Sequence, residues 1–202
     1  MGKVQFETIF YPGKTYNNEG LSILTEQLRA VAAECFLEVP LYQALSGKRK
    51  EMERAIICLA RDKDYNVIGF CSSLVLEVPT FGDVFHTGLT CVSPKARGLR
   101  LTHKLTSKIL INYLLNESPL SPVWVSNCAC VISSLGNAAL YFEDIFPSPF
   151  NKAHATKAQL GIAEYISKNY RGPIAINSDA VFTPETFVFE GSVDRKSTRL
   201  NS

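Results

Sequence analysis

The stretch that most constrains the fold of this chain runs from His86 to Leu115. Its first part, His86–Val92, is short, apolar and rich in β-branched residues, and Ser93-Pro94 ends it, so it predicts a strand. Its second part has apolar residues at helical spacing, which predicts a helix: Leu101, Leu105, Ile109, Leu110 and Leu114. A tight basic turn at residues 94–98 joins the two, so we expect a strand–turn–helix unit.

The turn before the helix predicts a site for an anion. A helix N-terminus presents unpaired backbone N–H groups and the positive end of the helix dipole, and both attract phosphate. Four cationic side chains stand around the same end: Arg97, Arg100, Lys104 and Lys108. These features indicate a pocket for a phosphorylated ligand; an ordinary strand–helix corner with a solvated basic face is the alternative.

The same residues resemble a known family. The pattern Val92-x-Pro94-x-x-Arg97-Gly98-x-x-Leu101-x-x-x-Leu105 is similar to the acetyl-CoA-binding segment of the GNAT superfamily of N-acetyltransferases. In that family Arg/Gln-x-x-Gly-x-Gly/Ala follows the fourth strand, and its backbone amides hold the pyrophosphate of CoA. Arg97 matches the leading residue, whereas Arg100 and Thr102 replace small residues that let the backbone approach the phosphates. The resemblance implies coenzyme contacts from this segment: Arg97, Gly98, Leu99, Arg100, Leu101 and Thr102.

Composition bounds the class of protein. The chain has 202 residues, of which 46% are hydrophobic and 20% are charged, and its formal net charge is +2. That is enough apolar material for the core of one domain. The near balance of charge argues against a dedicated nucleic-acid binder, and no apolar run reaches the roughly 18 residues of a membrane span. We expect a single domain over residues 1–193 and a polar tail, 194–202, that looks non-native or disordered.

The six cysteines lie in apolar stretches and form no Cys-x-x-Cys pair: Cys35, Cys58, Cys71, Cys91, Cys128 and Cys130. This usage is typical of reduced core residues in a cytoplasmic protein. The first residues, MGKVQFETIFYPG, become polar too quickly for a secretory signal. Cys128 and Cys130 would share one face of a strand, but core packing is the favoured interpretation and we expect no metal.

The N-terminal half predicts a strand over residues 4–11 and then an amphipathic helix that Asn17 or Asn18 caps. Its apolar stripe is Leu21, Leu24, Leu28, Val31, Ala32 and Cys35. A short second helix at Pro40–Leu45 and a charged connection over residues 46–54 follow. In the resembling family this region flanks the acceptor site, but the residues here do not define an acceptor.

The middle of the chain predicts a sheet. Ala55–Arg61 and Val67–Val78 form a hairpin, residues 79–83 turn into the strand that ends at Val92, and a fifth strand covers Val123–Val131. A strand–helix–strand step of this length implies parallel neighbours. The expected fold class is therefore α/β with a mixed sheet. It is the GNAT-like fold, mostly antiparallel, with a central parallel pair of the fourth and fifth strands flanked by helices.

Residues 134–146 carry a second resemblance, to the family's Asn-x-x-Ala-x-x-Leu-Tyr-x-x-x-Gly-Phe helix. Leu140, Tyr141 and Phe146 fall on the pattern, whereas Ser134, Asn137 and Ile145 replace its Asn, Ala and Gly. The segment follows the fifth strand, where the family has it. Beyond it we expect a helix over residues 152–170 and one strand, Thr186–Ser192, where the family closes with two.

The resemblance implies direct transfer of an acetyl group from acetyl-CoA to a primary amine. The fourth and fifth strands would splay, and the pantetheine arm would pair with the backbone of Thr90, Cys91 and Val92. Ser134 and Asn137 would add coenzyme contacts. Tyr141 matches a tyrosine that protonates the leaving thiolate, and His86 lies where several relatives have a glutamate that relays a proton from the amine. Core packing is the alternative role for both side chains.

Two other functions stay open at this point. A CoA-binding or structural module that has lost transfer would explain the departures at Arg100, Thr102, Ser134 and Ile145. A nucleic-acid-binding domain that uses the basic stripe is disfavoured by the small net charge. The acceptor and the oligomeric state do not follow from the sequence.

Overall fold

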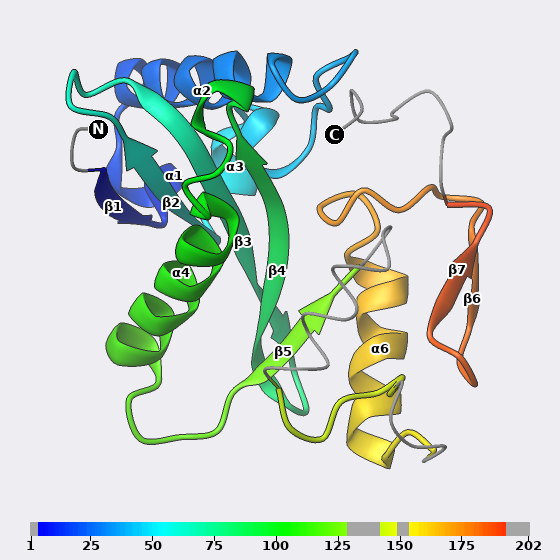
Figure 1. Ribbon diagram of the computed structural model, residues 1–202. Coiled ribbons are helices and arrows are strands. Elements are labelled where there is room, and N and C mark those ends of the chain that lie inside the picture. The colour runs from blue at the N-terminus through cyan, green and yellow to red at the C-terminus, as the bar shows by residue number, and fades with distance from the viewer. Residues whose placement is uncertain (1–3, 129–141, 149–153, 193–202) are drawn as a thin grey trace.

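The computed structural model describes residues 4–128, 142–148 and 154–192. Its main sheet has five strands in the order β1 (Gln5–Phe10), β2 (Ala55–Arg61), β3 (Val67–Val78), β4 (Gly82–Val92) and β5 (Trp124–Asn127) (Figure 1). The first four strands pair antiparallel, and β5 pairs parallel with β4. This confirms the mixed, mostly antiparallel sheet with its parallel pair. In the described part of the chain β5 is the last strand of the sheet.

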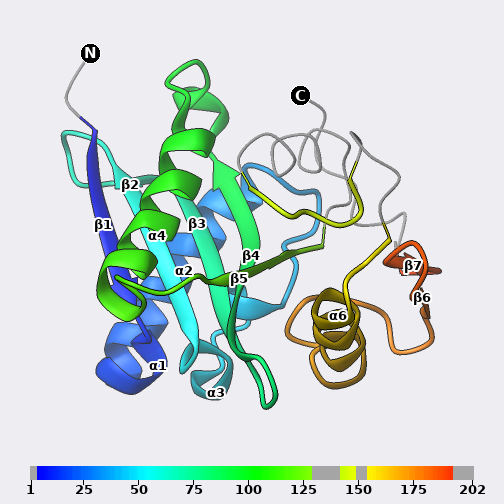
Figure 2. The same cartoon turned by 90° about the horizontal axis from the view of Figure 1, so that it is seen from below.

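Helices cover both faces of this sheet (Figure 2). The long ones are α2 (Asn18–Ala33), α4 (Leu101–Glu117) and α6 (Lys157–Asn169). Asn17 caps α2 by accepting from the Gly20 N–H, and Thr156 begins α6 with a capping box that includes Gln159. The short helices are α1 (Pro12–Thr15), α3 (Arg49–Met52) and the 3₁₀ turns η1 (Gln43–Leu45) and η2 (Pro94–Ala96). Thus α3 lies inside the expected charged connection, and the expected helix at Pro40–Leu45 is reduced to η1.

Two apolar clusters form the core, one on each face. The α2 face buries side chains of α2, the sheet and α6, among them Leu28, Leu59 and Ile166. The α4 face buries Phe85 with Leu101, Leu105, Ile109 and Tyr113 of α4. The Phe85 and Tyr113 rings lie 4.7 Å apart between centroids. The helical spacing in the organising stretch therefore corresponds to the buried side of α4.

Strand β4 carries one extra residue opposite β3. Cys71 pairs with Thr90 and Ser73 pairs with Thr87, so two steps along β3 correspond to three along β4. This is a β-bulge at Gly88–Leu89, opposite Ser72. A Cβ on Gly88 would collide with the Ser72 carbonyl oxygen, so this position requires glycine.

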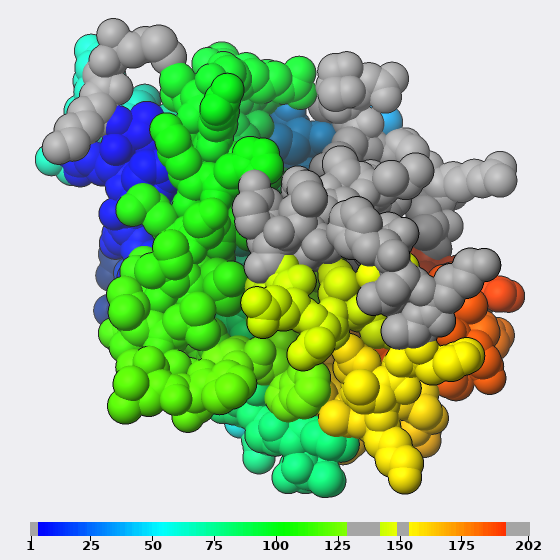
Figure 3. All heavy atoms as spheres, turned by 60° about the horizontal axis from the view of Figure 1, so that its bottom comes forward, coloured from blue at the N-terminus to red at the C-terminus, as the bar shows by residue number. Residues whose placement is uncertain are grey.

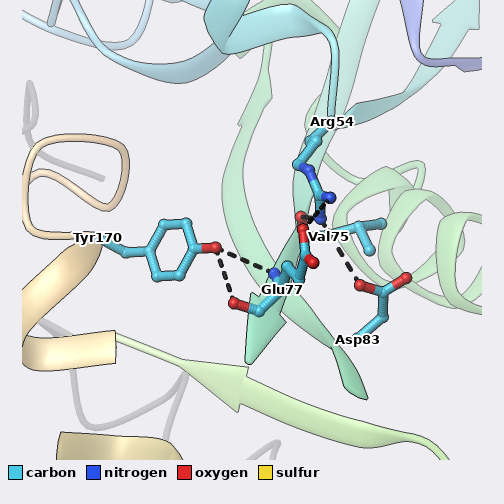
Figure 4. A network of polar contacts seen from close by, with 5 residues as sticks. All are labelled: Arg54, Val75, Glu77, Asp83 and Tyr170. Carbon is cyan, nitrogen blue, oxygen red and sulfur yellow. Dashed lines mark hydrogen bonds and ion pairs between the residues drawn. The ribbon is translucent and has the colours of Figure 1, made fainter. Parts of the chain in front are cut away.

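The C-terminal part packs against the far end of β3 and β4. Tyr170, which follows α6, binds the backbone of β3: its Oη accepts from the Glu77 N–H at 3.1 Å and donates to the Glu77 carbonyl at 2.9 Å (Figure 4). Nearby, Arg54 pairs with Glu77 at 2.6 Å and with Asp83 at 3.6 Å. These polar contacts attach the end of α6 to the β3–β4 hairpin.

The last described segment differs from the expectation of one strand. β6 (Val181–Thr183) and β7 (Val188–Glu190) pair antiparallel as a separate two-stranded sheet. Residues 142–148 contain no helix, although they overlap the predicted helix at 134–146; Asp144 has a positive φ of 50° and Pro147 follows closely. Residues 134–141 and the expected tail at 194–202 lie outside the described residues. Among the described helices, none has the length and apolar character needed to cross a bilayer.

Candidate functional site

The turn between β4 and α4 places a helix N-terminus at the end of the strand. Ser93 caps η2, Gly98 has a positive φ of 86°, and Arg100 precedes the helix with φ 54° and ψ 36°. Arg100 is thus left-handed, a conformation that costs a non-glycine residue about 1 kcal/mol. It stands where the resembling family has a small residue. Arg100 therefore adopts the left-handed backbone conformation that favours glycine, although it has a long side chain.

The start of α4 offers several unused donors. No side chain caps the helix, and the N–H groups of Leu101, Thr102 and His103 have no hydrogen-bond partner among the described residues. Arg97, Gly98, Arg100, Thr102 and Lys104 are exposed around them, whereas Leu101 is buried in the core and Leu99 is half-buried. The outer face of α4 lies on the surface of the molecule (Figure 3). Backbone donors and cationic side chains therefore lie together at the place where the sequence predicts an anion site.

Among the described residues, strand β4 has a partner on its β5 side at its beginning but not at its end. The parallel pairs run from Val84–Trp124 to Thr87–Asn127 and include every residue of β5, whereas β4 continues to Val92 (Figure 1). From Gly88 to Val92, no strand in the described part of the chain pairs with β4 on that side. We call the β5-facing side of Gly88, Leu89, Thr90 and Val92 the unpaired β4 edge.

The backbone direction at this edge follows from the pairing with β3. The Ser93 N–H donates to the Ile68 carbonyl at 2.9 Å, and antiparallel pairs alternate between bonded and non-bonded. Thr90 and Val92 therefore turn their N–H and C=O groups away from β3, toward the β5 side. The Cys35 thiol reaches this edge and donates to the Val92 carbonyl at 3.4 Å. Cys91 is buried, and Thr90 and Val92 are half-buried.

A polar contact joins β4 and β5 where they meet. His86 Nδ1 lies 2.9 Å from Ser126 Oγ, and Thr87 Oγ1 donates to the Ser126 carbonyl at 3.2 Å. His86 is 2% exposed, and burial lowers its pKa from 6.5 to about 4. The imidazole is therefore neutral at physiological pH and keeps a lone pair on one ring nitrogen.

The structure places part of the predicted site. The residues at 86, 90–92 and 97–102 follow one another from the closed end of the β4–β5 pair, along the unpaired edge, to the start of α4. Tyr141, Ser134 and Asn137 lie outside the described residues. Ser126, Cys35 and Gln43 contact or adjoin β4 but were not predicted. The β4–β5 register would have indicated Ser126, whereas no local sequence signal marks the other two.

Comparison with known proteins gives a loose structural likeness. No protein-family model matches the sequence, and no curated protein matches it either. An acetyltransferase from Trypanosoma brucei is 15% identical, with a TM-score of 0.48 over 71% of this chain and 94% of that one. The ribosomal-protein-alanine N-acetyltransferase of Brucella melitensis is 16% identical, with a TM-score of 0.42 over 67% and 88%.

A GNAT family N-acetyltransferase from Escherichia coli, YhbS, solved in complex with CoA, is also similar. It is 16% identical, with a TM-score of 0.42 over 55% of this chain and 57% of that one. The solved proteins named here are thus all acetyltransferases, but every one of these TM-scores is below 0.5. The fold assignment therefore rests on the strand order and pairing of this chain.

Proposed function

We propose that this chain is an N-acetyltransferase of the GNAT type that moves an acetyl group from acetyl-CoA to a primary amine. One observation carries the proposal. The unpaired β4 edge leads directly into a helix start with flanking cations and with N–H groups that have no partner in the described part of the chain. A strand edge that can bind amide groups, followed at once by an anion site, fits a ligand with an amide-containing arm and a diphosphate.

The coenzyme would bind in one direction. The N–H groups of Leu101 and Thr102, with the Arg97 and Arg100 side chains, would hold the diphosphate, and Gly98 and Leu99 would shape the turn. Thr90 and Val92 would pair with the amides of the pantetheine arm, with Cys91 between them. Ser134 and Asn137 would add contacts from the segment after β5, as the resemblance implies. Unpaired backbone groups are costly to bury, so a bound arm would stabilise this edge.

Transfer requires an amine without a proton and a proton for the sulfur. The amine nitrogen bonds to the carbonyl carbon while the carbon–sulfur bond breaks. His86, neutral because it is buried, would take the proton that the amine nitrogen loses, directly or through water. Tyr141 would donate a proton to the departing sulfur, since a phenol and a thiol have comparable pKa values. The cysteines suggest a cytoplasmic setting.

A second candidate is a CoA-binding or structural module without transfer. Arg100 and Thr102 favour it, because they place bulk where the resembling family lets the phosphates approach the backbone. Binding alone would not separate the two functions, whereas turnover would.

The experiment combines binding and turnover. Calorimetry should show CoA binding that weakens as salt rises, and Arg97→Glu should weaken it by about tenfold or more, since a charged hydrogen bond is worth about 1.5–3 kcal/mol. Lys63→Glu, at the exposed turn between β2 and β3, is the matched charge control and should leave affinity unchanged. Acetyl-CoA with a panel of amines then tests transfer. Absence of CoA affinity in the wild type would remove the coenzyme site, and affinity without turnover would favour the second candidate.

A further inference from the structure

A buried glutamine lies beneath the bulge of β4. Gln43 begins η1 and is 2% exposed, although glutamine is usually a surface residue. Its φ is +48°, a left-handed value that non-glycine residues seldom adopt. Its Oε1 accepts a hydrogen bond from Ser72 Oγ on β3 at 3.0 Å. A strained backbone that carries a buried, bonded amide indicates a position fixed by its surroundings.

The same amide fills the space beside Gly88. A Cβ added to Gly88 would collide with Gln43 Oε1 and lie 3.1 Å from Nε2. The side chain of Gln43 therefore packs directly against the β4 backbone at the bulge and, through Ser72, is attached to β3 at the residue that faces the bulge. Gln43, which is far from β4 in the sequence, thus packs against the bulge of β4 and holds its backbone in place.

The bulge lies at the end of the coenzyme path. If the diphosphate sits at the start of α4 and the arm runs along Val92 and Thr90, the far end of the arm points toward Gly88. There β4 and β5 come together at the Thr87–Asn127 pair, so the arm can go no farther between them. The reacting end must then lie beside the bulge that Gln43 supports.

We propose that Gln43 is a positioning residue: it holds the bulge of β4 in shape and thereby sets where the acyl thioester meets the amine. This inference rests on the proposed function. Small displacements of reacting groups have large effects on rate, with about 1 Å costing up to roughly 100-fold. The coenzyme phosphates bind elsewhere, so their affinity should not depend on Gln43.

The test uses three variants of the full chain. Gln43→Met keeps the length of the side chain and removes both polar groups. Ser72→Ala removes only the donor to Gln43. Ser73→Ala is the matched control, because its hydroxyl is also buried on β3, whereas the hydrogen bond to Gln43 comes from Ser72. Each variant is measured for CoA affinity, for kcat and KM with acetyl-CoA, and for hydrogen exchange at the Gly88 and Leu89 amides.

Gln43→Met should bind CoA within about twofold of wild type, while kcat falls by about 10- to 100-fold. Ser72→Ala should shift kcat in the same direction and Ser73→Ala should not. A folded Gln43→Met protein with unchanged kcat would overturn the inference; if that variant does not fold, Ser72→Ala against Ser73→Ala decides. If the wild type shows no transfer, the proposed function has failed separately. Exchange at Gly88 and Leu89 then tests the structural half of the inference: faster exchange in Gln43→Met and Ser72→Ala shows that Gln43 holds the bulge of β4 in shape, and equal exchange overturns it.

Discussion

Strands β3 and β4 each run past a neighbour, and their unpaired backbones differ in what satisfies them. β3 extends beyond β2, which begins at Ala55 opposite Leu74, and at Glu77 the Tyr170 hydroxyl binds both the N–H and the carbonyl. β4 extends beyond β5, and there the Cys35 thiol donates to the Val92 carbonyl. The protein thus completes the β3 edge with the Tyr170 hydroxyl, whereas the Thr90 and Val92 amides have no partner in the described part of the chain. Under the proposed function, the β4 edge binds the coenzyme arm, whereas the β3 edge contributes to stability.

The largest loss of stability should come from adding a side chain at Gly88, in the bulge of β4. Gly88→Ala would drive a Cβ into the Ser72 carbonyl oxygen, and backbone cannot move aside as a flexible side chain can. We expect a loss of about 3 kcal/mol or more, at the upper end of overpacking effects. That corresponds to a melting temperature roughly 6–12 °C lower for a chain of this size.

The control for this change is Gly172→Ala, since a Cβ there would meet nothing within 4 Å. It should melt within about 2 °C of wild type. A Gly88→Ala protein as stable as this control would show that the bulge is not fixed against β3.

The buried His86, which lies where β4 pairs with β5, should make the stability of the fold depend on pH. His86 has a pKa of about 4 when folded and 6.5 when unfolded, so the unfolded chain binds the proton first as pH falls. The free energy of unfolding should therefore fall between pH 6.5 and 4, by at most about 3 kcal/mol from this residue. Urea unfolding at several pH values measures it.

His86→Gln should remove this part of the acid dependence, and His103→Gln, at an exposed position on α4, should leave it in place. The difference between wild type and each variant isolates the histidine from carboxylates common to all three. An identical pH dependence in wild type and His86→Gln would mean that the buried imidazole takes up its proton as readily as an exposed one.

A ligand at the β4 edge should make it resemble the β3 edge. CoA should slow hydrogen exchange at the Thr90 and Val92 amides by roughly fivefold, as expected for an added hydrogen bond of about 1 kcal/mol. The Glu77 amide, which already donates to Tyr170, should not change. Equal slowing at all three amides would point to general stabilisation by the ligand, and no slowing at Thr90 and Val92 would exclude pairing there.

The smallest loss of stability should come from the β3 edge, where the Tyr170 hydroxyl binds the backbone of Glu77. Tyr170→Phe keeps the ring and removes the hydroxyl that binds Glu77; because water can replace it at this exposed place, we expect a loss of only about 0.5–1 kcal/mol. Tyr165→Phe on α6 is the control, with no hydroxyl bond among the described residues. A loss no larger than the control's would mean that water satisfies the β3 edge equally well.

The sequence predicts β2 and β3 to the residue, because each apolar run is bounded by clear turn residues. The Asn17 cap likewise marks the start of α2. β6 was missed because three residues are too few to show alternation. Gln43 was missed because its role depends on packing against Gly88, which lies 45 positions away in the printed sequence. The prediction that β4 separates from β5 came from the family resemblance, because the sequence pattern of a strand does not show whether a neighbouring strand pairs with it along its whole length.

The bulge also resolves the alternation of side chains along β4. Val84 faces the α2 core and Phe85 the α4 core, as alternation requires. Leu89 and Cys91, an odd number of positions after Val84, nevertheless face the α2 core as well. The extra residue shifts the alternation of side chains by one position. The residues before the bulge and those after it therefore each alternate regularly between the two faces of the sheet. Straightening the bulge without removing a residue would turn Leu89 and Cys91 toward the α4 core, whereas deletion of Gly88 would give β4 a single phase and keep both side chains facing the α2 core.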